Sequence, residues 1–354
     1  MKIILITGGC GFVGSNLAVL LKTKYPSYSI IAFDNLKRRG SEINISRLQK
    51  IGVDFIHGDV RNKEDFDQVG KIDLLIETSA EPSVLAGINS SLDYLINTNL
   101  TGTINCLNFA ARYKADFVFL STSRVYPIKQ LENIGFTESE TRFDISANQR
   151  VPGVSVLGIS ENFPLNGARS FYGATKLASE LLIAEFNEMH GMNTVIDRCG
   201  VITGPYQMGK IDQGVVVLWV ARHFWGKKLS YIGYGGEGKQ VRDILHIHDL
   251  FRLIDEQIHN IGQYNGEIYN VGGGADCCVS LQELTTLCEE VTGNKIPIER
   301  VVENRVADVR IYITDNTKIK LLSDWQPLKK PKEIVCEIFE WIKENEVILN
   351  KILN

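Results

Sequence analysis

Short apolar runs alternate with helically spaced apolar residues through the first 200 positions of the chain. Each apolar run ends in small or polar residues, and the runs cover residues 3–6, 28–33, 53–57, 73–77, 117–120 and 194–197. Runs of this length are typical of buried strands, and the helical spacing between them predicts connecting helices. Strands that alternate with helices favour an α/β fold with a doubly wound parallel sheet.

The rest of the chain carries a weaker form of the same pattern. We expect a strand over Ile268–Gly273 and an amphipathic helix around Ile334, Ile338 and Trp341, both in a smaller C-terminal α/β domain. The predicted domains are 1–190 for cofactor binding and 191–354 mainly for substrate binding, with some segments returning to the first. The polar, turn-rich segment between Tyr126 and Tyr172 is long for a connection and is therefore expected to be functional.

A glycine-rich turn follows the first predicted strand. Gly8, Gly11 and Gly14 form a G-x-x-G-x-x-G pattern that leads into a helix, and Asp34 ends the second strand 20 residues later. Such a turn brings backbone amides at a helix N-terminus close to a pyrophosphate, and the carboxylate can bind the adenosine ribose. We therefore expect a Rossmann-type sheet that binds NAD. Asp34 repels the 2'-phosphate of NADP, although the neighbouring Lys37-Arg38-Arg39 leaves that alternative open.

Composition excludes several other functions. A formal charge of −4 provides no basic footprint for nucleic acid and no polybasic patch for a membrane. Seven cysteines without framework spacing indicate reduced thiols, and the six scattered histidines complete no metal site. The apolar run at the start stops at Thr7-Gly8, too soon for a signal peptide or a membrane span. A cytoplasmic protein is expected.

The stretch Tyr172-Gly-Ala-Thr-Lys176 carries the candidate chemistry. A spacing of i, i+4 places the phenol and the ammonium on one helix face. Positive charge nearby favours the phenolate, so we expect Lys176 to lower the pKa of Tyr172 and to make it a general base and acid. Thr122 follows the strand at 117–120, at the sheet edge where ligands of such folds bind.

Together these motifs resemble the extended short-chain dehydrogenases/reductases. The resemblance spans nearly the whole chain and includes the glycine turn, Gly58-Asp59-Val60, Ser121-Thr122-Ser123, the Tyr172/Lys176 pair and Val241-Arg242-Asp243. Within that family the chain is similar to nucleotide-sugar epimerases, and most closely to the enzymes that invert C2 of CDP-hexoses of the paratose/tyvelose type. The resemblance implies an enzyme with NAD, a role in polysaccharide biosynthesis, and a homodimer joined through helices near 93–113 and 172–189.

The resemblance also implies roles for individual residues. Thr122 would bond to the reacting sugar oxygen, Tyr172 would move the proton, and Lys176 would hold the nicotinamide ribose. The implied cofactor-binding residues are Gly8, Gly11, Phe12, Val13, Gly14, Asp34, Asn35, Asp59, Val60, Ala80, Asn99, Tyr172, Lys176 and Cys199. The implied substrate-binding residues are Glu81, Ser83, Thr122, Ser123, Arg124, Gln207, Gln213, Gln240, Arg242, Arg305 and Asp308.

Departures from the family pattern narrow the range of reactions that this chain is expected to catalyse. A 4,6-dehydratase would carry Asp-Glu directly after the threonine, whereas this chain has Ser123-Arg124. An epimerase needs only Thr122, Tyr172, Lys176 and a retained cofactor. A 4-epimerase, a dehydrogenase or reductase, a decarboxylase of the same family, and a non-catalytic NAD-binding regulatory protein stay open as alternatives. After the fourth strand the chain has Glu77-Thr78-Ser79-Ala80-Glu81 in place of His-Leu-Ala-Ala/Gly, so Glu81 is either a sugar contact or a loop carboxylate.

Overall fold

The computed structural model describes residues 2–88, 90–209 and 213–353 and separates into two compact units. Unit 1 comprises Met1–Val125, Phe171–Arg198 and Phe251–Ile268. Unit 2 comprises Tyr126–Ser170, Cys199–Leu250 and Tyr269–Asn354. The chain therefore passes between the units several times, whereas a single cut near 190 would place 126–170 in the first of them. The division of cofactor and substrate binding between the domains stays a prediction.

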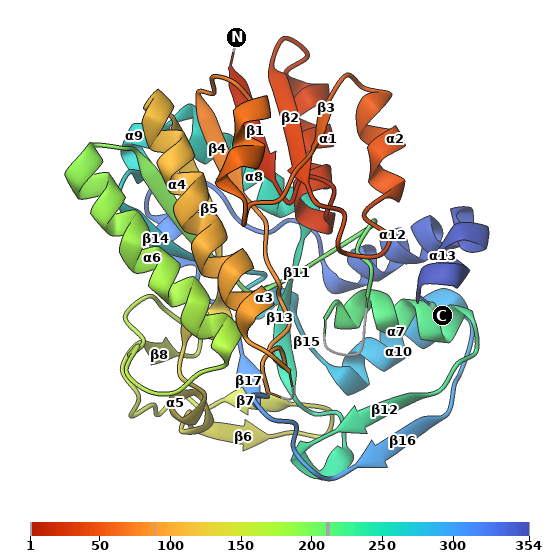
Figure 1. Cartoon of the computed structure of the whole chain (residues 1–354). Helices are drawn as coiled ribbons and strands as arrows, with labels where there is room; N and C mark the ends of the chain where they lie inside the picture. Colours follow the sequence, from red (N-terminus) through yellow and green to blue (C-terminus); the bar gives the residue numbers. More distant parts are fainter. Residues whose placement is uncertain (1, 89, 210–212, 354) are drawn as a thin grey trace. The chain divides into compact units, whose positions relative to one another are not determined.

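A seven-stranded sheet with the order β14-β10-β5-β4-β1-β2-β3 forms the main layer (Figure 1). All six apolar runs expected as strands belong to it, which confirms the predicted α/β fold. Neighbouring strands run parallel wherever their register is defined, with Thr7 beside both Phe33 and Glu77. The strands are β1 (Ile3–Thr7), β2 (Ser29–Asp34), β3 (Asp54–His57), β4 (Leu74–Glu77), β5 (Asp116–Thr122), β10 (Thr194–Cys199) and β14 (Glu267–Val271).

Strand β14 lies at the edge of the seven-stranded sheet, beside β10. Its residues from Tyr269 onward belong to unit 2, and its expected place in the smaller domain stays a prediction. Its last three residues are fully buried. A short apolar run of this kind suits a parallel strand, and its sequence does not reveal which sheet it joins.

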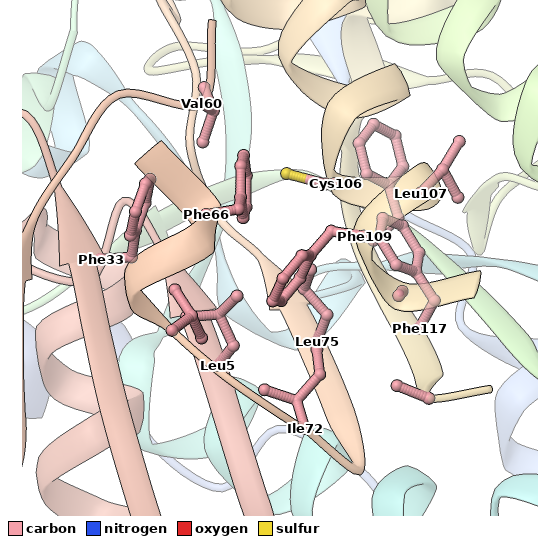
Figure 2. Close-up of a cluster of buried hydrophobic side chains, with 14 of the residues drawn as sticks. Leu5, Phe33, Val60, Phe66, Ile72, Leu75, Cys106, Leu107, Phe109 and Phe117 are labelled. Carbon is pink, nitrogen blue, oxygen red and sulfur yellow. The ribbon is translucent and has the colours of Figure 1, made fainter. Parts of the chain in front are cut away.

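Apolar side chains from the sheet and its helices form the core of unit 1. Phe33 stacks on Phe66 with ring centroids 4.9 Å apart, and Phe66 lies 5.0 Å from Phe109. Figure 2 shows these rings together with Leu5 and Leu75 from neighbouring strands. Ring pairs at this spacing add to the free energy gained from burying their surface.

Helices α4 (Gly102–Tyr113) and α6 (Phe171–His190) lie side by side against β5 (Figure 1). A continuous helical run leads into α4 from α3 (Asp93–Ile96) through a π-helical segment at Asn97–Thr101. Segments of this kind occur frequently at functional sites. Helix α1 (Phe12–Lys24) packs on β1 and β2, and α2 (Ile43–Gln49) packs on α1.

The buried face of α6 combines polar and apolar residues. Leu182, Ile183 and Phe186 belong to or pack against the apolar cluster of unit 1, whereas Leu181 is 65% exposed. The face turned toward the protein carries Tyr172, Gly173, Thr175, Lys176, Ser179, Glu180 and Ile183. The helix is therefore held both by polar groups that have buried partners and by apolar packing on the core.

Unit 2 contains smaller sheets. Strand β13 (Val241–His246) pairs in parallel with β11 (Val201–Thr203) and β17 (Ile311–Tyr312), and antiparallel with β15 (Cys278–Ser280). Strands β12 (Leu229–Ile232) and β16 (Ile298–Val301) form a separate parallel pair. The segment expected to be functional contributes α5 (Ile128–Glu132) and two hairpins, β6 (Phe136–Glu138) with β7 (Phe143–Ile145) and β8 (Val154–Ser155) with β9 (Gly158–Ile159).

Three helices pack against one another in unit 2, namely α7 (Val215–Phe224), α10 (Leu281–Thr292) and α12 (Pro331–Glu344). Ile334, Ile338 and Trp341 are buried on α12, which confirms the predicted amphipathic helix. The short helices α11 (Thr317–Lys320) and α13 (Glu346–Leu353) also belong to unit 2, whereas α9 (Ile261–Tyr264) and most of α8 (Ile247–His259) belong to unit 1. None of the helices in the described ranges has the length and apolarity required to cross a membrane.

Asp197 is a fully buried carboxyl group on β10 of unit 1. Its Oδ1 accepts a hydrogen bond from Gln257 Nε2 at 2.9 Å. Burial raises the pKa of Asp197 to about 7, although the bond from Gln257 acts in the opposite direction. The folded protein therefore holds a proton on this carboxyl at pH values where the unfolded chain has lost it.

We predict that Asp197→Asn removes a pH dependence of stability. The advantage of the protonated carboxyl is fully present below its unfolded pKa of 3.8 and is lost as the pH rises through about 7. The free energy of unfolding of the wild type should therefore fall relative to the variant over this window, by about 2–4 kcal/mol. Urea unfolding at a series of pH values measures this difference. Asp54→Asn, at an exposed position on β3, is the control, and its free energy of unfolding should follow that of the wild type over this window because it keeps Asp197.

Candidate active site

The turn between β1 and α1 can form only with glycine at its closest contacts. A Cβ atom at Gly14 would lie 2.3 Å from the carbonyl oxygen of Gly8 and 2.8 Å from Thr78 Oγ1. Gly8 itself has a φ of +64°, and its Cβ would lie 2.9 Å from the backbone of Ser79. The glycines therefore let the turn pack against the residues that follow β4, at the carboxyl edge of the sheet.

The N-terminus of α1 suits an anion. The N-cap residue is Gly11, and the first turn of this 13-residue helix contains no acidic side chain. The first backbone amides of a helix carry partial positive charge and need acceptors, which a pyrophosphate provides. The glycine turn and the start of α1, with Phe12 and Val13, therefore fit the phosphates of a dinucleotide.

Asp34 ends β2 beside this turn. Its carboxylate accepts hydrogen bonds from the amides of Cys10 at 3.0 Å and Leu36 at 2.8 Å. Burial raises the pKa of Asp34, although the amide hydrogen bonds oppose that shift. The residue stands where a carboxylate would bind the adenosine ribose, and its position joins the second strand to the glycine turn.

Asp59 and Asn35 form a second polar group at the same edge. Asn35 Nδ2 donates to Asp59 Oδ2 at 2.9 Å, and Arg61 forms an ion pair with Asp59 at 2.6 Å. Burial of Asp59 opposes its ionisation, but the hydrogen bonds from Arg61 and Asn35 outweigh this effect and lower its pKa. Val60, the next residue, is buried against Gly102.

Tyr94 on α3 lies beside two cations of this edge. The centroid of its ring is 5.4 Å from Lys37 Nζ and 4.9 Å from the Arg61 guanidinium. Lys37 belongs to the basic run that kept NADP open as an alternative. Contacts of this kind favour placing the cations over the ring.

Thr122, Tyr172 and Lys176 all belong to unit 1 and are buried. Thr122 is the last residue of β5, and the 3₁₀ turn Ser123–Val125 follows it, with the Arg124 amide donating to Thr122 Oγ1 at 3.2 Å. Helix α6 packs on both β5 and this turn, and Tyr172 lies in its first turn. Lys176 is 2% exposed, and its Nζ lies 4.1 Å from the centroid of the Phe119 ring. The structure therefore brings the elements that carry the three predicted residues together.

A buried ion pair lies one helical turn beyond Lys176. Glu180 of α6 binds Arg198 of β10 through contacts of 2.7 to 3.1 Å, and both side chains are almost fully buried. Ser121 Oγ also donates to Glu180. Because Ser121 precedes Thr122, this group ties α6 to the strand end that carries Thr122.

Asn99 in the π-helical segment links α6 to the loop after β4. Its side chain accepts from the Glu81 amide at 2.8 Å and donates to Thr175 Oγ1 at 3.2 Å, while its carbonyl accepts from Ser179 Oγ at 3.0 Å. Glu81 Oε1 in turn accepts from the Ser83 amide at 3.2 Å. These bonds fix the loop that includes Ala80. The side chains of Asn99 and Glu81 therefore support the conformation of this loop.

The site residues predicted in unit 2 have different surroundings. Arg242 pairs with Asp308 at 2.7 Å and also donates to the Val309 carbonyl, and Arg305 lies in the turn that leads to Asp308. The side-chain amides of Gln207 and Gln240 instead donate hydrogen bonds to the backbone carbonyls of Ile202 and Ile232, respectively. Gln213 follows residues 210–212, which lie outside the described residues, and Cys199 is buried at the end of β10.

An arginine surrounded by aromatic rings anchors the first hairpin of unit 2. The Arg310 guanidinium lies 4.1 Å from the ring centroid of Phe136, 5.6 Å from Phe143 and 5.2 Å from Tyr234. Phe143 also packs into an apolar cluster with Val241. Burial raises the pKa of Tyr234 to about 12, so this phenol stays protonated. The hairpin is therefore fixed by packing against the β13 sheet.

Most of the chain matches a known protein family. A family model described as the NAD dependent epimerase/dehydratase family matches residues 4–272. The chain belongs to this family. It is therefore an enzyme of the epimerase/dehydratase class with NAD as cofactor, and the resemblance drawn from the motifs is confirmed.

Members of the family with different reactions are similar to this chain. A CDP-paratose 2-epimerase of Salmonella typhi is 31% identical, with 96% of this chain and 98% of that protein covered. A UDP-glucose 4-epimerase of Bacillus subtilis is 27% identical, with 97% of each chain covered. A dTDP-glucose 4,6-dehydratase of Streptomyces venezuelae, solved with NAD bound, has a TM-score of 0.78 and 26% identity over 98% of each chain.

Several residues around the site escaped the sequence reasoning. Glu180 repeats the i, i+4 spacing from Lys176, so its place on the same helix face could have been inferred. Glu77, Thr103 and Arg198 gave no local signal, because their partners lie far away in the chain. Within the described ranges, no group of three or more His, Cys, Asp or Glu residues is arranged to hold a metal ion.

We predict that Gly14→Ala destabilises the protein and weakens NAD binding at least tenfold. Alanine normally stabilises a helix relative to glycine by about 1 kcal/mol, but the contact of 2.3 Å with Gly8 forces the turn apart and costs about 1–3 kcal/mol. Thermal unfolding and titration with NAD measure the two effects. Gly262→Ala on α9, where the new Cβ meets nothing within 4 Å, is the control. Unchanged stability and affinity in Gly14→Ala would contradict this account of the turn.

Proposed function

We propose that this chain is a nucleotide-sugar epimerase that inverts C2 of a CDP-hexose of the paratose/tyvelose type. The observation that carries this proposal is the buried Thr122, Tyr172 and Lys176 group, combined with the absence of a carboxyl pair after Thr122. The similarity to the CDP-paratose 2-epimerase, at 31% identity over nearly all of both chains, favours C2 as the inverted carbon and CDP as the nucleotide part of the substrate. The motifs Asp-Gln-Gly at 212–214 and Lys-Gln-Val-Arg-Asp at 239–243 favour the same group of enzymes.

The residues of unit 1 would hold the cofactor. The glycine turn and the α1 N-terminus would bind its pyrophosphate, Asp34 its adenosine ribose, and Asp59 with Val60 the region of the adenine. Lys176 would hold the nicotinamide ribose. NAD, when bound, supplies a hydride acceptor and donor at the reacting sugar carbon.

Tyr172 would carry the proton. As phenolate it accepts the proton of the reacting hydroxyl group, and the Thr122 hydroxyl donates a hydrogen bond to the same oxygen. The Lys176 ammonium favours the phenolate, because opposite charges on one buried helix face attract. Tyr172 then returns the proton to the same oxygen after the flat carbonyl group has turned its other face. The group therefore needs no further acid or base for epimerisation.

The residues after Thr122 argue against dehydration. Elimination of water requires a separate acid and base at two adjacent carbons. Ser123 and Arg124 occupy the next two positions, and neither bears a carboxyl group. Similarity to the 4,6-dehydratases therefore supports the shared fold and cofactor more than their reaction.

A 4-epimerase is the second candidate. The similarity to the Bacillus subtilis enzyme supports it, and the same three residues serve either carbon. The two functions differ in how the sugar is held. Arg242, Arg305 and Asp308 would bind the nucleotide part, since arginine makes paired hydrogen bonds to phosphate oxygens.

The proposed enzyme acts in the cytoplasm on polysaccharide precursors, as a homodimer. Support for the dimer comes from apolar side chains exposed on the expected helices. Leu181 and Met189 of α6 are 65% and 72% exposed, and Ile96 of α3 is 39% exposed. Exposed apolar groups on neighbouring helices favour association.

We predict inversion at C2 without added cofactor. Purified enzyme is incubated with CDP-paratose in D2O, with UDP-glucose in a parallel sample, and followed by proton NMR. Because the hydride returns to the carbon it left, the inverted C2 should keep protium. Tyr172→Phe should slow the reaction about 10²–10⁴-fold, and Tyr113→Phe on the neighbouring helix α4 should leave it unchanged.

Other outcomes of this experiment discriminate between the alternatives. Inversion at C4 of the UDP-sugar, with no change in CDP-paratose, would select the 4-epimerase. Consumption of added NAD+ with accumulation of a keto-sugar would instead indicate a dehydrogenase. No turnover of any nucleotide sugar and equal behaviour of wild type and Tyr172→Phe would favour a non-catalytic protein.

A further inference from the structure

Glu77 is a carboxyl group at the centre of the sheet edge that carries the site. It is the last residue of β4, and its register partners are Thr7 on β1 and Phe119 on β5. The side chain is fully buried, and Oε1 accepts a hydrogen bond from Thr103 Oγ1 at 2.7 Å. Its Oε2 has no hydrogen-bond partner within the described part of the chain. A buried oxygen of this kind requires an explanation.

The surroundings of Glu77 are largely apolar. Leu75 precedes it by two residues on the same strand, and the cluster in Figure 2 also includes Cys106 and Leu107 of α4. An ionised carboxylate in such a place is costly unless a positive charge lies nearby. Lys176 provides that charge, because its Nζ lies 4.1 Å from the centroid of Phe119, the strand neighbour of Glu77.

The groups that face Glu77 come from three elements. Lys176 lies on α6, Thr103 and Cys106 lie on α4, and Thr7 lies on β1. Burial raises the pKa of Glu77 to about 7, while the charge of Lys176 and the hydrogen bond from Thr103 oppose the shift. Burial, and then the charge of Glu77, raise the pKa of Cys106, so its thiol stays neutral. Lys176 is therefore the cation of this group.

We propose that Glu77 is a positioning residue that keeps the buried Lys176 protonated and directed toward the ends of β4 and β5. A lysine that is 2% exposed tends to lose its proton, since burial disfavours the charged form. A carboxylate within the same apolar layer offsets that tendency. The proposal rests on the proposed function, in which the charge of Lys176 acts on Tyr172. It explains why a carboxyl group ends β4 although no substrate or cofactor is assigned to it.

Glu77→Gln tests the proposal, because it keeps the shape and an acceptor for Thr103 but removes the charge. The full-length protein is labelled with ¹³Cε-lysine, and the Lys176 signal is assigned by its loss in Lys176→Met. The titration midpoint of Lys176 should fall by at least about one pH unit in Glu77→Gln, a tenfold loss of proton affinity. The alkaline limb of kcat/KM should move in the same direction.

Two further variants separate charge from structure. Thr103→Val removes the hydrogen bond to Glu77 but leaves its charge, so the Lys176 midpoint should stay at the wild-type value. Glu77→Asp keeps the charge and should restore most of the midpoint lost in Glu77→Gln. A lower unfolding temperature in any of them, without a change in the lysine titration, reports only a structural contribution.

An unchanged Lys176 midpoint in Glu77→Gln would overturn the proposal, whatever its activity. If this variant does not fold, the wild type provides the test, since the Lys176 signal should shift with an inflection near pH 7 as Glu77 ionises. A Lys176 signal that does not change near pH 7 would equally overturn the proposal. Failure of the proposed function looks different, because no CDP-hexose would then be converted while the lysine titration still depends on Glu77.

Discussion

A charged lysine in a nearly dry environment is the constraint on which this site depends. Lys176 is 2% exposed and lies over the Phe119 ring, so its ammonium has exchanged most of its water for protein groups. Such an exchange is unfavourable unless negative or polar groups compensate. Burial also increases the effect of the lysine on nearby groups, because a charge acts more strongly on its neighbours in a medium of low dielectric constant. Tyr172, one turn earlier on the same helix face, is in the position to respond.

The other polar contacts of α6 follow from placing this lysine against a sheet. Thr175 and Ser179 are bound by Asn99, and Glu180 is paired with Arg198. Each of these groups is buried and would be costly alone, but together they hold the helix on the sheet. The bond between Ser121 and Glu180 extends the arrangement to the strand end before Thr122. The residues proposed to transfer the proton are therefore positioned in part by a polar layer between α6 and the sheet.

The sequence predicted the parts of this structure that depend on local pattern. Buried strands, the glycine turn and the Tyr172/Lys176 spacing are each visible within about ten residues, and the strand runs were confirmed. The buried face of α6 cannot be derived from apolar spacing alone, because Leu181 is apolar yet 65% exposed while Glu180 is buried. Which side of a helix faces a sheet depends here on Arg198 and Asn99, which are distant in the chain. The joining of β14 to the main sheet and the role of Glu77 likewise depend on long-range contacts that no local pattern reports.

The central claim is that the buried Lys176 ammonium prepares Tyr172 for proton transfer. The most direct measurement is the titration of Tyr172 by NMR of ¹³Cζ-labelled tyrosine, in the wild type and in Lys176→Met, with Tyr172→Phe used to assign the signal. The account predicts that Tyr172 ionises below the usual tyrosine value of about 10 in the wild type and at a clearly higher pH in Lys176→Met. Equal titration of Tyr172 in the two proteins would contradict it.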